Sequence, residues 1–417
     1  MTKGRLWFLA LAAALGGFLF GYDTAVINGG EQQIQRVWSL SSLLHGWVMS
    51  SALWGTVIGA VCGGKVCDRL GRKPTLFWVG VFYLVSAVWS AFAAGPYDLM
   101  VARFLGGLGV GASSIAAPVY IAEISPAESR GKLGGLFQFN IVLGMVVSQF
   151  VNWAIGTAGL GDATWRWMLG AEAVPALAFT VVTLFMTESP RWQGMRAARP
   201  ESAPYHCSTS DLQPSTFFSR TNLRPILLAF CVAMFNQLSG INAMMYFAKR
   251  VFEMAGMTAS AALGTAAGLS IVLGLGTFAG LFLIDRFGRR TLLVVGSVGC
   301  IVAHFAAAAA FLLDFGLLAA ACIFLFIVFF AMGQGVVIWV FISEIFPQRF
   351  RAQGQSWGSF THWTFCAVLT FAFPLMAVRW APWMIFALFG CCLVVHLLWA
   401  VFVCPETKGR SLEEIRI

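Results

Sequence analysis

The sequence predicts an all-α membrane protein made of two similar bundles of six helices. Hydrophobic residues make up 59% of the 417 and charged residues 11%, whereas a soluble domain carries roughly 25% charged residues. The charged phrase Asp68-Arg69-Leu70-Gly71-Arg72-Lys73 returns 217 positions later as Asp285-Arg286-Phe287-Gly288-Arg289-Arg290. Such self-similarity at a fixed spacing indicates an internal duplication.

Two further phrases recur in the same order at nearly the same spacing. Glu123-Ile124-Ser125-Pro126 with Arg130 matches Glu344-Ile345-Phe346-Pro347 with Arg351, 221 positions later. The segment 187–191 has a looser counterpart in 405–409. Their glutamates, Glu188 and Glu406, are 218 positions apart. Each phrase adjoins sequence apolar enough to cross a membrane. Two such halves with the substrate held between them are typical of secondary transporters.

The apolar stretches between the charged phrases predict twelve membrane spans, six in each half. They are expected near 6–27, 46–65, 75–94, 99–121, 133–157, 167–187, 225–247, 260–284, 291–313, 317–342, 356–378 and 382–403. The halves are then 1–187 and 225–405, with a tail at 406–417. The segment 188–224 between them is rich in proline and polar residues, so we expect a largely irregular cytoplasmic linker.

The formal net charge of +9 follows from membrane topology. With the N-terminus in the cytoplasm, 21 Lys and Arg residues fall in cytoplasmic segments, five in outer loops and one within a span. This asymmetry is the positive-inside rule, which predicts that both termini are cytoplasmic. It also removes the reason to expect a nucleic-acid partner. The ten cysteines lie mostly within the spans, so we expect neither a disulfide framework nor a metal site.

The charged phrases and several polar ones resemble the sugar porter family of the major facilitator superfamily. The matching segments are 21–25 (Gly-Tyr-Asp-Thr-Ala), both Asp-Arg-x-Gly-Arg loops, Glu123 with Arg130-Gly131, 188–191, 237–242, 343–347 and 405–409. The resemblance covers nearly the whole chain and implies the major facilitator fold. The linker is shorter than in that family, Ala352 stands where a glycine is usual, and Val336 stands where a proline is usual. The missing proline weakens the expectation of a kink in span 10.

Asp23 and Arg103 form the sharpest charged pair within the spans. Asp23 lies about 17 residues past the inner edge of span 1, or roughly 26 Å, and Arg103 lies roughly 22 Å above the inner face. At nearly equal depth the two can pair. A carboxylate that parts from its cation in a desolvated bundle takes up a proton, so a proton switch is one interpretation. The resemblance implies the same role, and a static ion pair is the alternative.

Amides and aromatic rings within the spans indicate a sugar site, because sugars offer many hydroxyl groups and ring faces. Span 7 supplies Asn236, Gln237, Asn242 and Tyr246, and Ser239-Gly240 can loosen the helix so that Gln237 and Asn242 face one cavity, as in the discontinuous helices of transporters. The resemblance implies a sugar site lined by Phe20, Gln138, Gln237, Asn242, Trp339, His362 and Trp363. His362 stands where an amide is usual. Structural hydrogen bonding or packing is the alternative for each.

Three other polar residues in the spans have weaker interpretations. Glu172 in span 6 is expected to join the cytoplasmic charge network, with a direct transport role as the alternative. His304 and His396 stand alone on apolar helices, so we expect them in the core or facing lipid.

The repeated charged loops are expected to serve gating and structure on the cytoplasmic side. The glycine of each loop permits a tight turn, and the acidic and basic residues can bond helix ends. Glu123, Arg130, Glu344 and Arg351 lie at the inner ends of spans 4 and 10 and are interpreted as a gate, with topological anchoring as the alternative. The complete set is Asp68, Arg69, Arg72, Glu123, Arg130, Glu188, Arg191, Asp285, Arg286, Arg289, Glu344, Arg351 and Glu406.

Taken together, these features predict proton-coupled import of a monosaccharide, hexose or pentose, by alternating access. A sugar or polyol uniporter and a non-transporting sugar sensor are the alternatives. An enzyme is not expected, because the spans show no catalytic constellation, metal-ligand cluster or nucleotide loop. No cofactor is expected besides the coupling proton. The compact length and short tails favour a bacterial inner membrane, and a monomer is expected.

Overall fold

The protein is described by a computed structural model, which we discuss for residues 2–126, 130–197, 217–219, 222–347 and 350–408. Within 130–132, 195 and 351–352 only the backbone is considered. The chain divides into two compact units, Met1–Asp211 (unit 1) and Leu212–Ile417 (unit 2). Twelve helical segments of the described chain are long and apolar enough to cross a membrane, which confirms the predicted number of spans. The chain is therefore a multi-pass, all-helical membrane protein.

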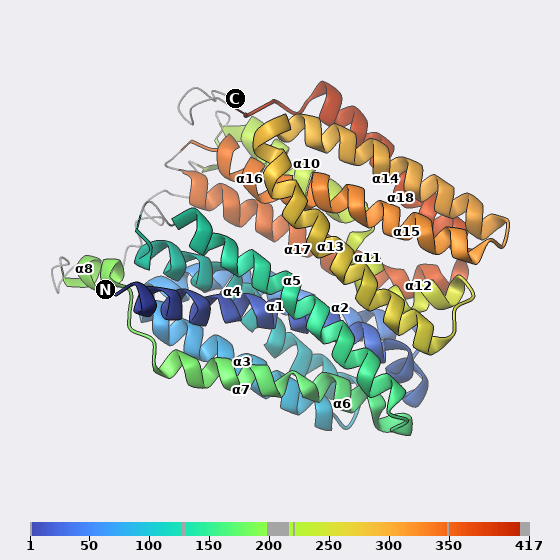
Figure 1. Ribbon diagram of the computed structural model, residues 1–417, viewed down its shortest axis with the longest axis horizontal. Coiled ribbons are helices and arrows are strands. Elements are labelled where there is room, and N and C mark those ends of the chain that lie inside the picture. The colour runs from blue at the N-terminus through green and yellow to red at the C-terminus, as the bar shows by residue number, and fades with distance from the viewer. Residues whose placement is uncertain (1, 127–129, 198–216, 220–221, 348–349, 409–417) are drawn as a thin grey trace. The chain divides into compact units, whose positions relative to one another are not determined.

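The helices of unit 1 follow one another through short connections (Figure 1). They are α1 (Lys3–Val37), α2 (Ser42–Leu70), α3 (Arg72–Phe92), α4 (Pro96–Ile124), α5 (Arg130–Thr157), the 3-10 turn η1 (Gly161–Ala163), α6 (Thr164–Ala171), α7 (Ala173–Leu184) and α8 (Pro190–Ala197). Within the unit α2 packs on α4 and α1 on α5. The sixth span consists of η1, α6 and α7 together.

Unit 2 contains two spans that are interrupted. Its helices are α10 (Leu223–Leu238), α11 (Ile241–Tyr246), α12 (Ala248–Met254), α13 (Ala259–Phe287), α14 (Arg289–Leu312), α15 (Gly316–Phe330), the π-helical turn η3 (Ala331–Gly335), α16 (Val336–Ile345), α17 (Arg351–Arg379) and α18 (Pro382–Phe402). Span 7 is divided between α10 and α11, and span 10 between α15 and α16. Within the unit α14 packs on α15 and α18, and α10 on α17.

Small residues let the helices of unit 1 approach closely. A Cβ atom added to Gly107 of α4 would lie 1.8 Å from the carbonyl oxygen of Ala52 in α2. One added to Gly55 of α2 would lie 2.2 Å from the carbonyl oxygen of Phe104. Lipid tails are as apolar as the side chains, so the hydrophobic effect does not drive helices together within a membrane. Van der Waals contact between closely packed backbones holds them together instead. These glycines are therefore packing residues.

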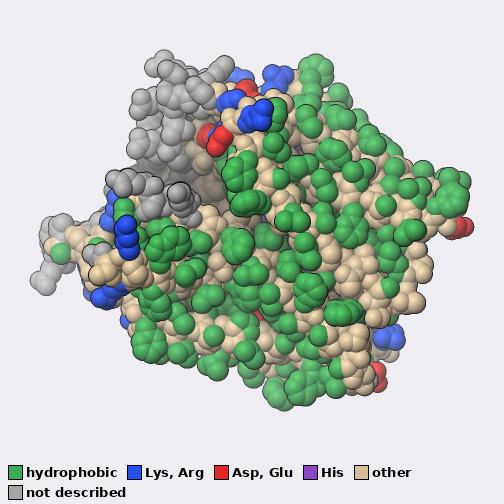
Figure 2. All heavy atoms as spheres, viewed as in Figure 1, with side chains coloured by type: hydrophobic (Ala, Val, Ile, Leu, Met, Phe, Trp, Pro, Cys, Tyr) green, Lys and Arg blue, Asp and Glu red, His purple; other side chains and the backbone are tan. Residues whose placement is uncertain are grey.

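The outward-facing side chains are mostly apolar. Figure 2 shows apolar side chains over most of the visible face, with most of the visible charged side chains toward its margins. Several large apolar residues are strongly exposed, among them Phe92, Leu317 and Phe402 at 79%, 82% and 79%. Exposure of this extent suits contact with lipid tails and would be unfavourable in water.

The first helix is longer than the predicted span 6–27, since α1 continues ten residues past residue 27, to Val37. Its second half is polar, but the polar side chains have partners inside the unit. Asn28 donates to Gln149 at 3.1 Å, and Gln33 donates to the carbonyl of Gly161 at 2.6 Å. A hydropathy window does not detect such pairwise contacts, which allow the polar turns to stay helical.

The segment after the sixth span also differs in part from the prediction. Residues Pro190–Ala197 form helix α8, although an irregular segment was expected. Trp192 of this helix donates from its indole nitrogen to the carbonyl of Asp68 at 2.9 Å, which fixes α8 to the end of α2. The middle of the expected linker, 198–216, and the tail beyond Lys408 lie outside the described residues.

Candidate functional site

A buried ion pair joins Asp23 of α1 to Arg103 of α4. Each side chain is 3% exposed. Nη1 of Arg103 lies 2.5 Å from Oδ1 of Asp23, and Nη2 donates to the backbone carbonyl of Asp23 at 3.1 Å. Charge-assisted hydrogen bonds away from water are strong, and separating the partners would leave uncompensated charges. The two residues therefore share a depth within unit 1, as the residue count along the spans predicted.

Glu172 lies beside this pair, so the prediction that it joins the cytoplasmic network is wrong. It occupies the junction of α6 and α7 and is 1% exposed. Its buried carboxyl group lies close enough to Asp23 and Arg103 to interact electrostatically with both. Spans 4 and 6 both begin on the predicted outer side of the membrane. Arg103 and Glu172 each lie in the first half of their span, so the two residues are at a similar depth. The count that placed Arg103 would also have placed Glu172.

The cluster of Asp23, Arg103 and Glu172 is suited to binding a proton. With both carboxyl groups ionised it carries one net negative charge, and with one protonated it is neutral. A net charge buried in an apolar bundle is costly, and two neighbouring carboxylates repel each other. The arrangement can therefore hold one proton and release it when the guanidinium contact or the surroundings change.

The break in span 7 brings amides from both of its sides together in unit 2. Gly240 adopts a left-handed conformation with φ of +85°, which ends α10 and starts α11 in a new direction. As a result, Asn242 of α11 donates from Nδ2 to Oε1 of Gln237 in α10 at 2.6 Å. On an unbroken helix these side chains would point about 140° apart. The predicted loosening of the helix at Ser239-Gly240 is confirmed, and a cavity shared by the two amides stays a prediction.

Aromatic side chains of α16 and α17 adjoin these amides. Nε2 of Gln237 lies 3.1 Å from both ring nitrogens of His362. The ring of His362 is 5.0 Å from that of Trp339 and 5.0 Å from that of Trp363. Unit 2 therefore gathers two amides, an imidazole and two indoles, which are the groups that bind sugar hydroxyls and stack on sugar rings. We call these five residues the amide–aromatic cluster.

Three other predicted sugar-site residues lie on the expected spans. Tyr246 is buried in α11, one turn beyond Asn242. Phe20 of α1 and Gln138 of α5 are partly buried in unit 1. Their participation in sugar binding stays a prediction.

His304 and His396 are buried and have polar partners, so the expectation that they lie in the core is confirmed and neither faces lipid. His396 of α18 lies 2.9 Å from Oγ of Ser297 and 3.1 Å from Nε2 of Gln334. Gln334 belongs to the π-helical turn η3, and its carbonyl accepts from Asn236 at 3.4 Å. Span 10 is thus irregular without the proline usual in the family, and the wider turn directs Gln334 to His396. His304 of α14 lies 3.0 Å from the carbonyl oxygen of Ser239.

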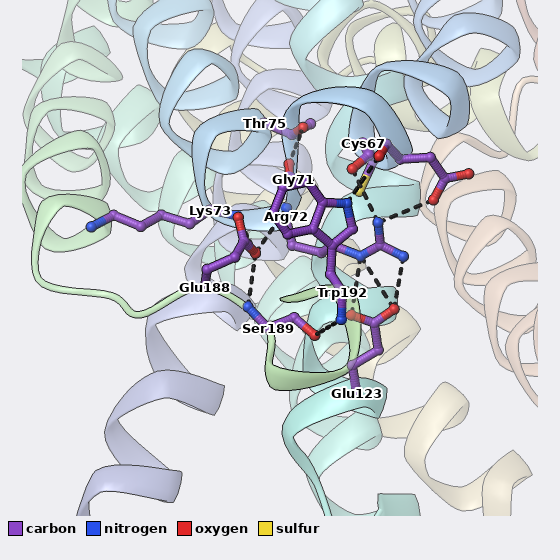
Figure 3. A network of polar contacts seen from close by, with 10 residues as sticks. Cys67, Gly71, Arg72, Lys73, Thr75, Glu123, Glu188, Ser189 and Trp192 are labelled. Atoms are coloured by element: carbon purple, nitrogen blue, oxygen red, sulfur yellow. Dashed lines mark hydrogen bonds and ion pairs between the residues drawn. The ribbon is translucent and has the colours of Figure 1, made fainter. Parts of the chain in front are cut away.

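The first charged loop of unit 1 lies at the centre of a polar network (Figure 3). Arg72 donates from Nε and Nη2 to the carboxylate of Glu123, with the shortest contact at 2.8 Å, and pairs with Asp68 at 3.1 Å. The carboxylate of Glu188 accepts from the backbone N–H groups of Arg72 and Lys73, at 3.0 and 3.2 Å. It therefore caps the N-terminus of α3, where the helix dipole favours an anion.

The second charged loop repeats this network in unit 2. Arg289 donates to Glu344 at 2.8 and 3.1 Å, and Glu406 accepts from the backbone N–H groups of Arg289 and Arg290 at 2.9 and 3.0 Å. Gly71 and Gly288 have φ of +103° and +90°, and a Cβ at either would crowd the capping carboxylate. Glu188 and Glu406 are thus structural equivalents, as their weak sequence echo indicated.

The remaining residues of the charged loops take several positions. Asp285 is mostly exposed and lies 3.5 Å from Arg289. Arg69, Arg191 and Arg286 are exposed, and the guanidinium of Arg286 lies 5.5 Å from the ring centre of Phe287. The side chains of Arg130 and Arg351 lie outside the described residues. The gate predicted from these residues therefore stays a prediction.

Comparisons with known proteins agree with this architecture. The family model described as "Sugar (and other) transporter" matches residues 9–417. The arabinose-proton symporter of Bacillus subtilis (strain 168) is 32% identical, over 99% of this chain and 95% of that protein. The glucose transporter GlcP of Staphylococcus epidermidis is 31% identical, over 99% and 97%. The inward-open structure of the xylose transporter XylE from Escherichia coli superposes with a TM-score of 0.86 at 29% identity, covering 98% of this chain and 99% of that one.

The chain therefore belongs to the sugar porter family of the major facilitator superfamily. It is a multi-pass membrane transporter and not an enzyme.

Proposed function

We propose that this protein imports a monosaccharide, a hexose or a pentose, together with a proton by alternating access. The observation that carries the coupling is the buried cluster of Asp23, Arg103 and Glu172, which becomes neutral by binding one proton. Relatives named as arabinose-proton and D-xylose-proton symporters, at 32% and 29% identity, support the same assignment.

The amide–aromatic cluster of unit 2 is the proposed sugar-binding surface. Gln237, Asn242 and His362 offer donors and acceptors to sugar hydroxyl groups, and Trp339 and Trp363 offer apolar ring surfaces. The amides of Gln237 and Asn242 bond one another, and Gln237 also bonds His362. A sugar hydroxyl would replace these contacts. Phe20, Gln138 and Tyr246 are proposed as further contacts.

Proton and sugar binding need to favour the same conformational change for transport to be coupled. Loss of the Asp23–Arg103 contact would strand two charges, so protonation of a carboxyl group lowers the cost of a rearrangement that separates them. Protonation therefore changes the free-energy difference between the conformation with the ion pair and the one without it. A coupling ion needs such a difference to shift the equilibrium between conformations. We further propose that the protein is a monomer in a bacterial inner membrane. The distribution of Lys and Arg supports a cytoplasmic position for both termini.

Uptake into proteoliposomes tests this function. Labelled D-xylose, D-glucose and L-arabinose are supplied with and without an inward proton gradient, and myo-inositol serves as a polyol control. We expect accumulation of at least one monosaccharide above equilibrium, only with the gradient. Equilibration of the sugar to the same level with and without the proton gradient would indicate a uniporter. Binding without uptake would indicate a sensor.

A further inference from the structure

The break in span 7 requires a partner for a backbone carbonyl group. In a continuous helix the carbonyl of Ser239 would accept from the amide of Ala243. Here α11 starts only at Ile241, and its first turn is closed by Met244 N–H donating to Gly240 at 3.0 Å. The Ser239 carbonyl is thereby released from the helical ladder. A buried carbonyl without a donor would be costly, so the break depends on another group to satisfy it.

His304 of α14 supplies this donor from a distant part of the chain. Its Nε2 lies 3.0 Å from the Ser239 oxygen, and the residue is 1% exposed. Since a carbonyl can only accept, His304 carries a proton on Nε2. Its Nδ1 is buried and has no hydrogen-bond partner among the described residues, so this nitrogen is best left without a proton. The contact fixes the tautomer of the ring.

Aromatic rings hold both the imidazole and the break in position. The ring of His304 lies 4.3 Å from that of Phe326 and 5.9 Å from that of Phe389. Phe389 also packs on Gly240, since a Cβ added there would lie 2.6 Å from its ring. The same aromatic wall therefore contacts the donor and the left-handed glycine. His304 is held by this wall and has little room to turn away from Ser239.

We propose that His304 is a positioning residue that holds span 7 broken, so that Gln237 and Asn242 meet in one sugar site. It acts through the Ser239 carbonyl and does not itself touch the sugar. The proposal rests on the proposed function for its transport consequence. Its structural consequence, a braced break at Ser239-Gly240, does not depend on which sugar is carried.

Two matched substitutions test the brace. His304→Gln places an amide nitrogen near the position of Nε2, whereas His304→Asn has similar chemistry but is one methylene shorter. We expect sugar affinity of the Asn variant to fall roughly tenfold, the effect of leaving a buried carbonyl unpaired. We expect the Gln variant to stay within about threefold of wild type, since its donor is restored. Cys300→Ala, one turn away in α14, controls for general damage to this core.

Binding and local opening are measured on the same full-length samples. The dissociation constant comes from whichever of the three sugars wild type transports, and hydrogen–deuterium exchange follows the amides of 241–246. We expect faster exchange there in the Asn variant alone, with Cys300→Ala lowering thermal stability but leaving affinity unchanged. Equal affinity and exchange in the Asn and Gln variants would overturn the brace.

The brace and the proposed function can fail separately. If wild type bound none of the sugars, the function would be wrong, while the exchange data would still decide the brace. If wild type bound sugar and loss of affinity followed thermal stability across all variants, the role of His304 would be general packing.

Discussion

At Asp23, two carboxyl groups share one guanidinium, because Glu172 lies beside the aspartate that Arg103 binds. The charge balance of this site depends on both acids. With Glu172 neutralised, Asp23 and Arg103 would already form a neutral pair. An added proton would then create a net positive charge in the bundle, which is costly. Glu172 therefore makes proton binding charge-neutralising.

Glu172→Gln is the substitution that tests this balance. We expect the variant to exchange sugar across the membrane at a rate similar to wild type. Sugar accumulation should fall at least several-fold at neutral pH and recover in more acidic medium, because protonation is no longer helped by a second carboxylate. The measurement is uptake against external pH, with exchange of labelled for unlabelled sugar as the control. An unchanged pH profile would contradict a role for Glu172.

The charged and polar residues within the spans differ in how well their partners could be predicted from the sequence. Asp23 and Arg103 could be paired from residue counts alone, because both lie on regular helices of known direction. Glu172 was open to the same count but was assigned to the cytoplasmic side. The partner of His304 could not be predicted, since it is a backbone carbonyl that becomes available only where another helix breaks. Contacts to backbone groups leave no sequence pattern.

Among the helices, the clearest repeated device is a glutamate that caps the helix after each charged loop. Glu188 caps α3 and Glu406 caps α14, in both cases by accepting two successive backbone N–H groups. Each carboxylate approaches over a glycine in the left-handed region. The duplication has thus preserved a complete structural unit that includes the capping residue more than one hundred positions away.

We expect Glu188→Gln to lower the free energy of unfolding by about 1 to 2 kcal/mol, because the anion at the N-terminus of α3 is lost. Asp285→Asn is the control, since its side chain is 81% exposed, and such pairs contribute about 0 to 1 kcal/mol. Thermal unfolding in detergent measures both. Equal losses of stability would argue against capping as the main role of Glu188.

Close packing of α2 on α4 gives a second test at this scale. Gly107→Ala should prevent normal folding or lower thermal stability strongly, because its Cβ would overlap the carbonyl of Ala52. Gly134→Ala is the matched control, since no atom lies within 4 Å of a Cβ built there. Yield of folded protein after purification distinguishes them. A tolerated Gly107→Ala would contradict the described helix contact.

The helices themselves were largely predictable because membrane spans have a strong apolar signal. Their irregular parts were predictable only where a residue type marks them. Gly240 marked the break in span 7, whereas Gly333 and Gly335, without a proline, did not by themselves indicate a π-helical turn at 331–335. The extension of α1 also escaped prediction, since it depends on partners such as Gln149 that lie far along the chain.

At the scale of the whole molecule, the two candidate sites belong to different units. The cluster proposed to bind a proton lies in unit 1, and the amide–aromatic cluster lies in unit 2. Coupling between them must be a free energy shared by both ligands. By linkage, a proton that strengthens sugar binding is itself bound more strongly when sugar is present. This reciprocity can be measured without knowing the path between the sites.

Orientation of the chain is a further prediction at this scale. A fluorescent reporter that matures only in the cytoplasm should be active when fused to either terminus, as the excess of Lys and Arg in the predicted inner segments requires. A reporter active only outside the cytoplasm serves as the opposite control. Signals from the two termini on different sides would contradict an even number of spans.

Proton movement driven by sugar is the most direct test of the account. Proteoliposomes without an imposed proton gradient carry a pH-sensitive dye inside, and a transported sugar is added outside. Wild type should acidify the interior as sugar enters. Asp23→Asn should exchange labelled for unlabelled sugar without any change of pH. Sugar entry without acidification in wild type, or equal acidification in Asp23→Asn, would contradict coupling through this aspartate.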